Sequence, residues 1–146
     1  MIRITTKVCD FLDAGTDDNI WLQFRNNYDS GQGRETCQTD ELVHFWENDF
    51  GRNMHQTWSG GDLGSCNGFR PIDWVAFRFK TDAWGANLHA NDLTLCKVTV
   101  QFGQPGSWLQ PGTAGYSFWE WNGKLSDKFC HWGDCRSDWE IMDKIA

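Results

Sequence analysis

Residues Leu12–Leu22, with the sequence LDAGTDDNIWL, join an acidic turn to the start of an alternating apolar segment. The turn carries Asp13, Asp17 and Asp18 around a single glycine. Such a turn can offer carboxylate and backbone carbonyl oxygens to Ca²⁺, which takes about 6–8 oxygen ligands. The same residue types also build solvated turns that hold no metal. The stretch therefore predicts a strand that follows either a calcium-binding loop or an ordinary turn.

The segment that begins at Ile20 has the two-residue period of a strand with one buried face, because apolar and mostly polar residues alternate along it. Three other segments follow the same pattern, at residues 2–8, 75–80 and 98–102. Their predicted inner faces are Ile2, Ile4, Thr6 and Val8; Val75, Phe77 and Phe79; and Val98, Val100 and Phe102. With 15 glycines between short segments, the pattern predicts an all-β, antiparallel sandwich.

Two Pro-Gly steps between Gly103 and Gly112 interrupt this pattern. We therefore expect a β-sandwich over residues 1–103 and a C-terminal extension over residues 104–146 that packs on the sandwich. Within the extension, Ser137 and Glu140 have the spacing of a capping box ahead of Ile141, Met142 and Ile145. This motif predicts a short C-terminal helix.

The charge balance is acidic, with 13 basic and 20 acidic residues and a formal net charge of −7. This balance argues against a nucleic-acid partner, which clustered Lys and Arg would recognise. Six cysteines without a Cys-x-x-Cys pair indicate disulfides formed in an oxidising compartment, and hence a secreted protein. The spacing leaves the connectivity open, and Cys130 with Cys135 is the one local pairing we expect.

The sequence offers little support for catalysis. It contains no Gly-x-Ser-x-Gly elbow, and its four histidines are scattered. We therefore expect a protein that is not an enzyme. The chain is rich in tryptophan, with ten residues of this type. Most should lie in the core, whereas Trp46 and Trp84 stand beside acidic turns, where an indole suits a membrane interface, a sugar ring or a protein partner.

Four motifs in order resemble the PLAT family, the C2-like β-sandwich of animal lipoxygenases and pancreatic-type lipases. They are Asp13–Asp18 followed by the Ile20–Leu22 strand, Asn48–Arg52, Asp62–Ser65 ahead of the Trp74–Lys80 strand, and Asn91–Asp92 leading into Val98–Val100. The resemblance covers about residues 2 to 102. It implies a PLAT/C2-like sandwich whose loops at one end hold calcium while neighbouring apolar side chains enter a bilayer.

The resemblance also implies a set of site residues. The metal ligands would be the Gly15 carbonyl, Asp17, Asp18, Asn48, Asp49 and Asp92, and we add Asp13 from its place in the first loop. The residues in contact with the membrane or another ligand would be Phe11, Leu12, Trp84 and Leu88. Ordinary packing beneath the turns is the alternative for these four apolar residues.

The function expected from these observations is that of a secreted, Ca²⁺-dependent module without catalytic activity that binds a membrane lipid or a lipid-associated protein. Two alternatives remain open. One is a carbohydrate-binding, lectin-like module that uses exposed tryptophans. The other is a structural or toxin-like secreted protein whose acidic loops are solvated turns and whose extension contacts the partner.

Overall fold

The computed structural model describes residues 1–12, 14–15, 19–26, 35–44, 49–60, 63–82, 93–104, 109–126, 129–131 and 134–146. For residues 129–131 it describes the backbone alone. The elements are β1 (Ile2–Val8), β2 (Asn19–Asn26), β3 (Thr36–Gln38), β4 (His55–Ser59), the 3₁₀ helix η1 (Gly64–Gly68), β5 (Val75–Asp82), β6 (Thr94–Phe102), β7 (Ser117–Ser126), β8 (Phe129–His131), β9 (Asp134–Arg136), β10 (Glu140–Ile141) and β11 (Asp143–Lys144).

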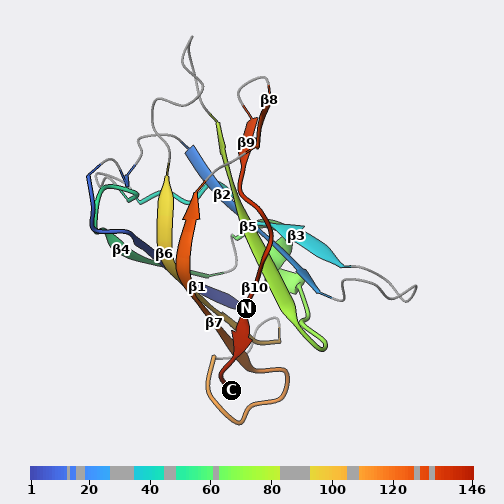
Figure 1. The fold of residues 1–146 in the computed structure, drawn as a ribbon. Coiled ribbons are helices and arrows are strands. Elements are labelled where there is room, and N and C mark those ends of the chain that lie inside the picture. Colours follow the sequence, from blue (N-terminus) through green and yellow to red (C-terminus); the bar gives the residue numbers. More distant parts are fainter. Residues whose placement is uncertain are drawn as a thin grey trace.

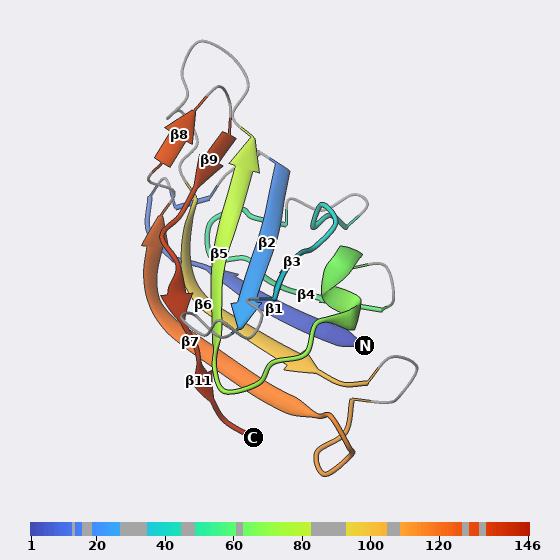
Figure 2. The same cartoon turned by 90° about the vertical axis from the view of Figure 1, so that its right-hand side faces the viewer.

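The strands form two antiparallel sheets that face each other (Figures 1 and 2). Sheet A has the order β11-β7-β6-β1-β4, and sheet B has the order β3-β2-β5-β9-β8, with β10 also paired to β5. The all-β sandwich expected from the sequence is confirmed. Among the described residues, no helix is long and apolar enough to cross a membrane.

The core lies between the sheets and is built from the alternating faces that the sequence predicts. Ile2, Ile4 and Val8 of β1 are fully buried, as are the predicted inner residues of β5. The alternating apolar residues of β2 are also fully buried: Ile20, Leu22 and Phe24. Aromatic rings join the two layers, since Phe24 of β2 meets Phe102 of β6 edge-on at 5.8 Å between ring centroids. Burial of these large side chains supplies the main stabilisation of the sandwich.

The segment after residue 103 supplies strands to both sheets. In sheet A, β7 pairs with β6 along its length from Thr94↔Ser126 to Phe102↔Ser117. In sheet B, β9 pairs with β5 through Thr81↔Cys135. Trp119 of β7 is 2% exposed, and its Nε1–H donates to Ser117 Oγ over 2.9 Å. The C-terminal part of the chain thus forms part of the same core.

The predicted C-terminal helix is wrong, because residues 140–144 form the short strands β10 and β11. Ser137 does not cap a helix: its Oγ accepts a hydrogen bond from Phe79 N, and its own N–H donates to Phe79 O. Met142 is buried, whereas Ile141 and Ile145 are 69% and 55% exposed, which is not the stripe of an amphipathic helix. The open edges of β5 and β7 offer backbone partners, and these outweigh the local helix signal.

Disulfides brace each sheet. Cys9, after β1, is bonded to Cys96 of β6, and Cys37 of β3 is bonded to Cys66 of η1. Cys135 is also disulfide-bonded, and it stands opposite Cys130 in the β8–β9 ladder. The Cys130 side chain lies outside the described part of the structure, so its pairing with Cys135 stays a prediction.

Candidate functional site at the loop pole

One end of the sandwich collects the loops in which the sequence places its candidate ligands. Here β1 ends at Val8, β4 begins at His55, β2 begins at Asn19, β5 ends at Asp82 and β6 begins at Thr94. These termini are neighbours because the strands run antiparallel, with Asn19 opposite Asp82 and Lys7 opposite His55. We call this end the loop pole; β8 and β9 stand at the same end, at the top of Figures 1 and 2.

The first loop is tied to the sandwich on both sides of its described part. Cys9 N donates to Thr94 O, and Thr94 N donates to Ala14 O over 2.9 Å. Ala14 is fully buried. The Cys9–Cys96 disulfide holds the same point of the chain. The start of this loop is therefore anchored to β6 by backbone as well as covalent contacts.

Gly15 brings the first loop against the second. A Cβ atom at this position would lie 2.6 Å from Arg52 N and 2.8 Å from Phe50 O, so a larger residue would push the two segments apart. The exposed side chains of Asp10 and Arg52 form an ion pair of 3.0 Å between the same two loops. The resemblance placed Gly15 and the Asn48–Arg52 motif at one site, and the structure brings Gly15 and Phe50–Arg52 into contact.

Asp49, a predicted metal ligand, is held by a histidine that sequence reasoning missed. Its side chain is 4% exposed, and Oδ2 accepts a hydrogen bond from His44 N over 2.6 Å. Oδ1 lies 2.6 Å from His44 Nδ1, and His44 Nε2 lies 2.9 Å from the carbonyl oxygen of Thr57. His44 therefore links the second loop to β4. Its place five residues before Asp49 carries no motif that could have revealed this contact.

Aromatic stacking reinforces the second loop. The ring of Trp58 on β4 stacks on His44 at 5.1 Å and on Phe50 at 5.3 Å, with interplanar angles of 17° and 14°. Trp58 is 6% exposed, and its buried Nε1 has no hydrogen-bond partner among the described residues. Because Asp49 accepts hydrogen bonds from His44 and precedes Phe50 in the chain, the stack holds two neighbours of Asp49 in place.

Two of the four apolar contact candidates lie in the described part of the chain. Leu12 is 76% exposed, which excludes ordinary packing beneath the turn as the reason for its place here. Phe11 is 38% exposed, and Lys124 Nζ lies 5.5 Å from the centre of its ring. Trp84 and Leu88 lie outside the described residues. Val43, in the second loop, is 58% exposed and was not among our candidates.

The predicted metal ligands are only partly described. Asp13, Asp17, Asp18, Asn48 and Asp92 lie outside the described residues. Within the described ranges, no group of three or more His, Cys, Asp or Glu side chains is arranged to hold a metal ion. Gly15 offers a backbone carbonyl. Asp49 receives two donors from His44, and a carboxylate has about four lone-pair sites, so its oxygens keep acceptor capacity. Both groups fit the oxygen chemistry of calcium.

Comparisons with known proteins give a likeness of fold alone. No family model matches the chain, and no curated protein matches it. Among solved structures, the alpha toxin from Clostridium absonum is similar at 17% sequence identity and a TM-score of 0.41. The likeness covers 87% of this chain, which spans 30% of the toxin chain. At this identity and TM-score it assigns neither a family nor a function.

Proposed function

We propose that this chain is a secreted, non-catalytic module that binds Ca²⁺ at the loop pole and thereby engages a membrane lipid or a lipid-associated protein. The PLAT-like motifs, the clustering of the loop termini and the disulfides support this function. Disulfides are typical of proteins that fold in an oxidising compartment, which is consistent with secretion.

The exposure of Leu12 carries the proposal. A leucine that is 76% exposed in an anchored loop contributes no packing to the core. Transfer of this side chain from water into an apolar layer would stabilise the bound state by about 1.5–3 kcal/mol. Phe11 and Val43 extend the apolar rim at the same pole. Apolar side chains beside charged loops suit the boundary of a bilayer, where polar groups remain in water while the apolar groups leave it.

The charge of the protein explains why calcium would be required. At a net charge of −7, an anionic lipid surface repels the chain. A bound divalent cation supplies positive charge next to the rim and neutralises the loop carboxylates. Asp13, Asp17, Asp18, Asn48, Asp49, Asp92 and the Gly15 carbonyl are the proposed ligands. The membrane contacts would be Phe11, Leu12, Trp84 and Leu88.

Sedimentation with phosphatidylserine vesicles tests the membrane part of this proposal. The native chain should sediment with vesicles in calcium and remain in the supernatant with a chelator. Leu12→Asp should lose most of this binding, because a charge cannot enter the apolar layer without a large cost. Ile72→Asp is the matched control, since Ile72 is 59% exposed but lies before β5, at the opposite end from the loop pole. Equal losses in the two variants would contradict the proposal.

Thermal unfolding tests the metal part. A ligand that binds only the folded protein at 100 times its dissociation constant adds about 2.7 kcal/mol to the free energy of unfolding. Calcium should therefore raise the melting temperature of the native chain, and Asp17→Asn with Asp18→Asn should remove that rise. A melting temperature that calcium leaves unchanged in the native chain would contradict a calcium site at this pole.

A further inference from the structure

The outward face of sheet B differs from the loop pole in both chemistry and position. Strand alternation places Gln23 and Arg25 of β2 on this face, with Arg78 and Lys80 of β5 beside them. Trp139, which follows β9, covers two of these side chains: the guanidinium carbons of Arg25 and Arg78 lie 4.2 Å and 4.5 Å from the centre of its ring. We call this surface the Trp139 face.

Two hollows meet at Trp139. The wider one, of about 600 Å³, is lined by Arg25, Trp74 and Trp139 together with the acids Asp138 and Glu140. The narrower one, of about 320 Å³, lies on the side of Arg78 and Gln38. Its described lining contains no acidic residue; besides Arg78 it consists of polar side chains, the disulfide-bonded Cys37 and Trp139. The two hollows therefore differ in charge and share Trp139 in their linings.

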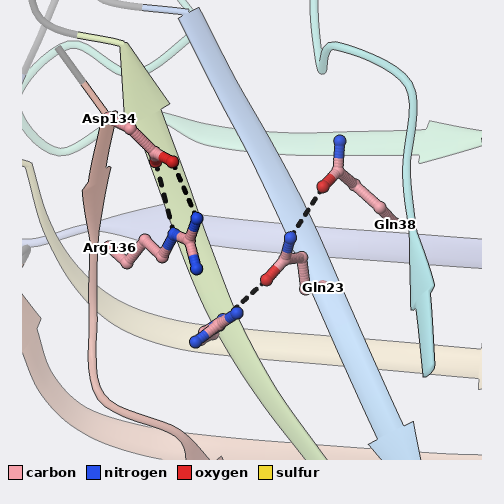
Figure 3. Close-up of polar contacts among 5 residues, drawn as sticks. Gln23, Gln38, Asp134 and Arg136 are labelled. Atoms are coloured by element: carbon pink, nitrogen blue, oxygen red, sulfur yellow. Dashed lines mark hydrogen bonds and ion pairs between the residues drawn. The ribbon is translucent and has the colours of Figure 1, made fainter. Parts of the chain in front are cut away.

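Hydrogen bonds fix the orientation of the side chains in the narrow hollow (Figure 3). Arg78 Nε, which can only donate, donates to Gln23 Oε1 over 2.6 Å. The amide nitrogen of Gln23 must then face Gln38, where Nε2 donates to Oε1 over 2.6 Å. The amide nitrogen of Gln38 points away from Gln23 in Figure 3. This relay has an arginine at one end and an amide donor at the other, so it suits a ligand that accepts hydrogen bonds.

Positive charge accumulates beside this relay. Burial lowers the pKa of Arg78, and the nearby charges of Arg136 and Arg25 lower it further. Lys80 stands directly opposite Arg136 in the β5–β9 ladder, an arrangement that destabilises a sheet. Asp134 offsets part of this charge through its ion pair of 2.8 Å with Arg136. Asp138 and Glu140 line the wide hollow, so among the described residues the narrow hollow carries positive charge from Arg78 without an acidic residue in its lining.

We propose that the Trp139 face binds an acidic saccharide, with a sulfate or carboxylate group in the narrow hollow near Arg78 and Gln38. The wide hollow would take the neighbouring sugar ring, because Asp138 and Glu140 can accept hydrogen bonds from hydroxyl groups and Trp74 and Trp139 offer aromatic surface. The saccharide should carry its charge on one ring only, because Asp138 and Glu140 would repel a second anionic group in the wide hollow, as they would repel the carboxylates of an acidic peptide. This site is separate from the loop pole and needs no calcium.

Isothermal titration with an oligosaccharide that carries a single sulfate group, in a chelating buffer, tests the site. Gln38→Glu keeps an oxygen that accepts from Gln23 Nε2 but replaces the outer amide donor with a charged oxygen. We expect this variant to bind at least about tenfold more weakly, as the loss of a hydrogen bond to a charged group implies. Gln101→Glu makes the same change on β6 of sheet A and should leave the affinity within about twofold.

A second variant protects the test against a loss of folding. Thr36→Glu adds a negative charge to the exposed rim of the narrow hollow and leaves the relay intact, so it should weaken the oligosaccharide as well. No binding by the native chain, or equal losses in Gln38→Glu and Gln101→Glu, would overturn the proposal. Binding of poly-glutamate, or of phosphatidylserine vesicles in chelator, with the same dependence on Gln38 would overturn it too. A failure here leaves calcium-dependent vesicle binding unaffected.

Discussion

The outward faces of the two sheets use the same alternation for different chemistry. On sheet A, the hydroxyl groups of Thr5 and Thr99 form a hydrogen bond, and Lys97 Nζ lies 3.9 Å from Glu120 Oε2. On sheet B, Arg25, Arg78, Lys80 and Arg136 gather on one face, which Trp139 partly covers. Sheet A thus shows solvated cross-strand pairs, including Lys7 opposite Lys97, whereas sheet B places two of its cations against an aromatic ring.

This difference follows from the C-terminal segment rather than from the sheets alone. After β9 the chain continues along the edge of β5 and pairs with it again through β10. It then reaches sheet A, where β11 pairs with β7. Met142, between β10 and β11, is buried, and its N–H donates to Val75 O over 2.9 Å. The segment closes the side of the sandwich and positions Trp139 above the arginines. The edge of β5 is therefore covered, and Trp139 lines the two hollows on this side of the sheet.

Removal of residues 104–146 should have the largest effect. Sheet A would lose β7, with the buried Trp119 and Trp121, and sheet B would lose β9 and β10. We expect no cooperative thermal transition by far-UV circular dichroism, because β6 and β5 would each expose an open edge and the core would also lose Leu125 and Met142. A cooperative transition in residues 1–103 would show that the predicted division is real and that the sheets do not depend on the extension.

Removal of each of the two described disulfides compares how much covalent bracing stabilises each sheet. Cys9–Cys96 closes a separation of 87 residues in sheet A, and Cys37–Cys66 closes 29 residues at the edge of sheet B. Replacing either pair with alanines should cost about 2–5 kcal/mol, with the loss at Cys9–Cys96 larger by about 1 kcal/mol because its loop is longer. Urea unfolding of both double variants measures this, and equal losses would argue that native-state contacts outweigh loop entropy.

The buried carboxylate of Asp49, beside sheet A, should contribute more to the free energy of unfolding than an exposed carboxylate. Asp49→Asn replaces one of the two oxygens that face His44 N and Nδ1, so we expect a loss of about 1–3 kcal/mol in the free energy of unfolding. Asp143→Asn on the exposed strand β11 is the control and should change it by less than about 0.5 kcal/mol. Chemical unfolding measures both, and a similar result for the two variants would contradict a structural role of the His44–Asp49 contact.

The smallest effect is expected at Asp134 on sheet B. A hydrogen bond from Arg136 holds the pKa of this carboxyl below its ordinary value, with Lys80 and Arg78 acting in the same direction against a partial effect of burial. A lowered folded-state pKa means that the contribution is present above the unfolded value of about 3.9 and disappears as pH falls through the folded value. Asp134→Asn should cost less than about 1 kcal/mol at pH 7. An NMR titration in which Asp134 keeps its ordinary pKa would remove the basis for this prediction.

Much of the fold is predictable from local pattern. The alternating residues of β1, β2, β5 and β6 predicted both the strands and their buried faces, because a period of two decides which side chains leave water. Short strands were harder to predict from the sequence, since β10 and β11 have two residues each, too few for an alternating pattern to appear. The Ser137 motif misled us because a serine oxygen can accept equally well from a helix terminus or from the edge of a neighbouring strand.

The candidate sites likewise combine features that the sequence predicts with contacts that only the tertiary structure shows. The acidic loops, Leu12 as a candidate contact residue and the acidic charge balance could be read from residue types and their order. The contact of Gly15 with Arg52, the capture of Asp49 by His44, and the relay from Arg78 to Gln38 could not. Their partners are distant in the chain or unmarked by any motif, and only the packing of two sheets brings them within bonding distance. Local chemistry specified strands and polar loops, whereas long-range backbone pairing chose which of those groups meet.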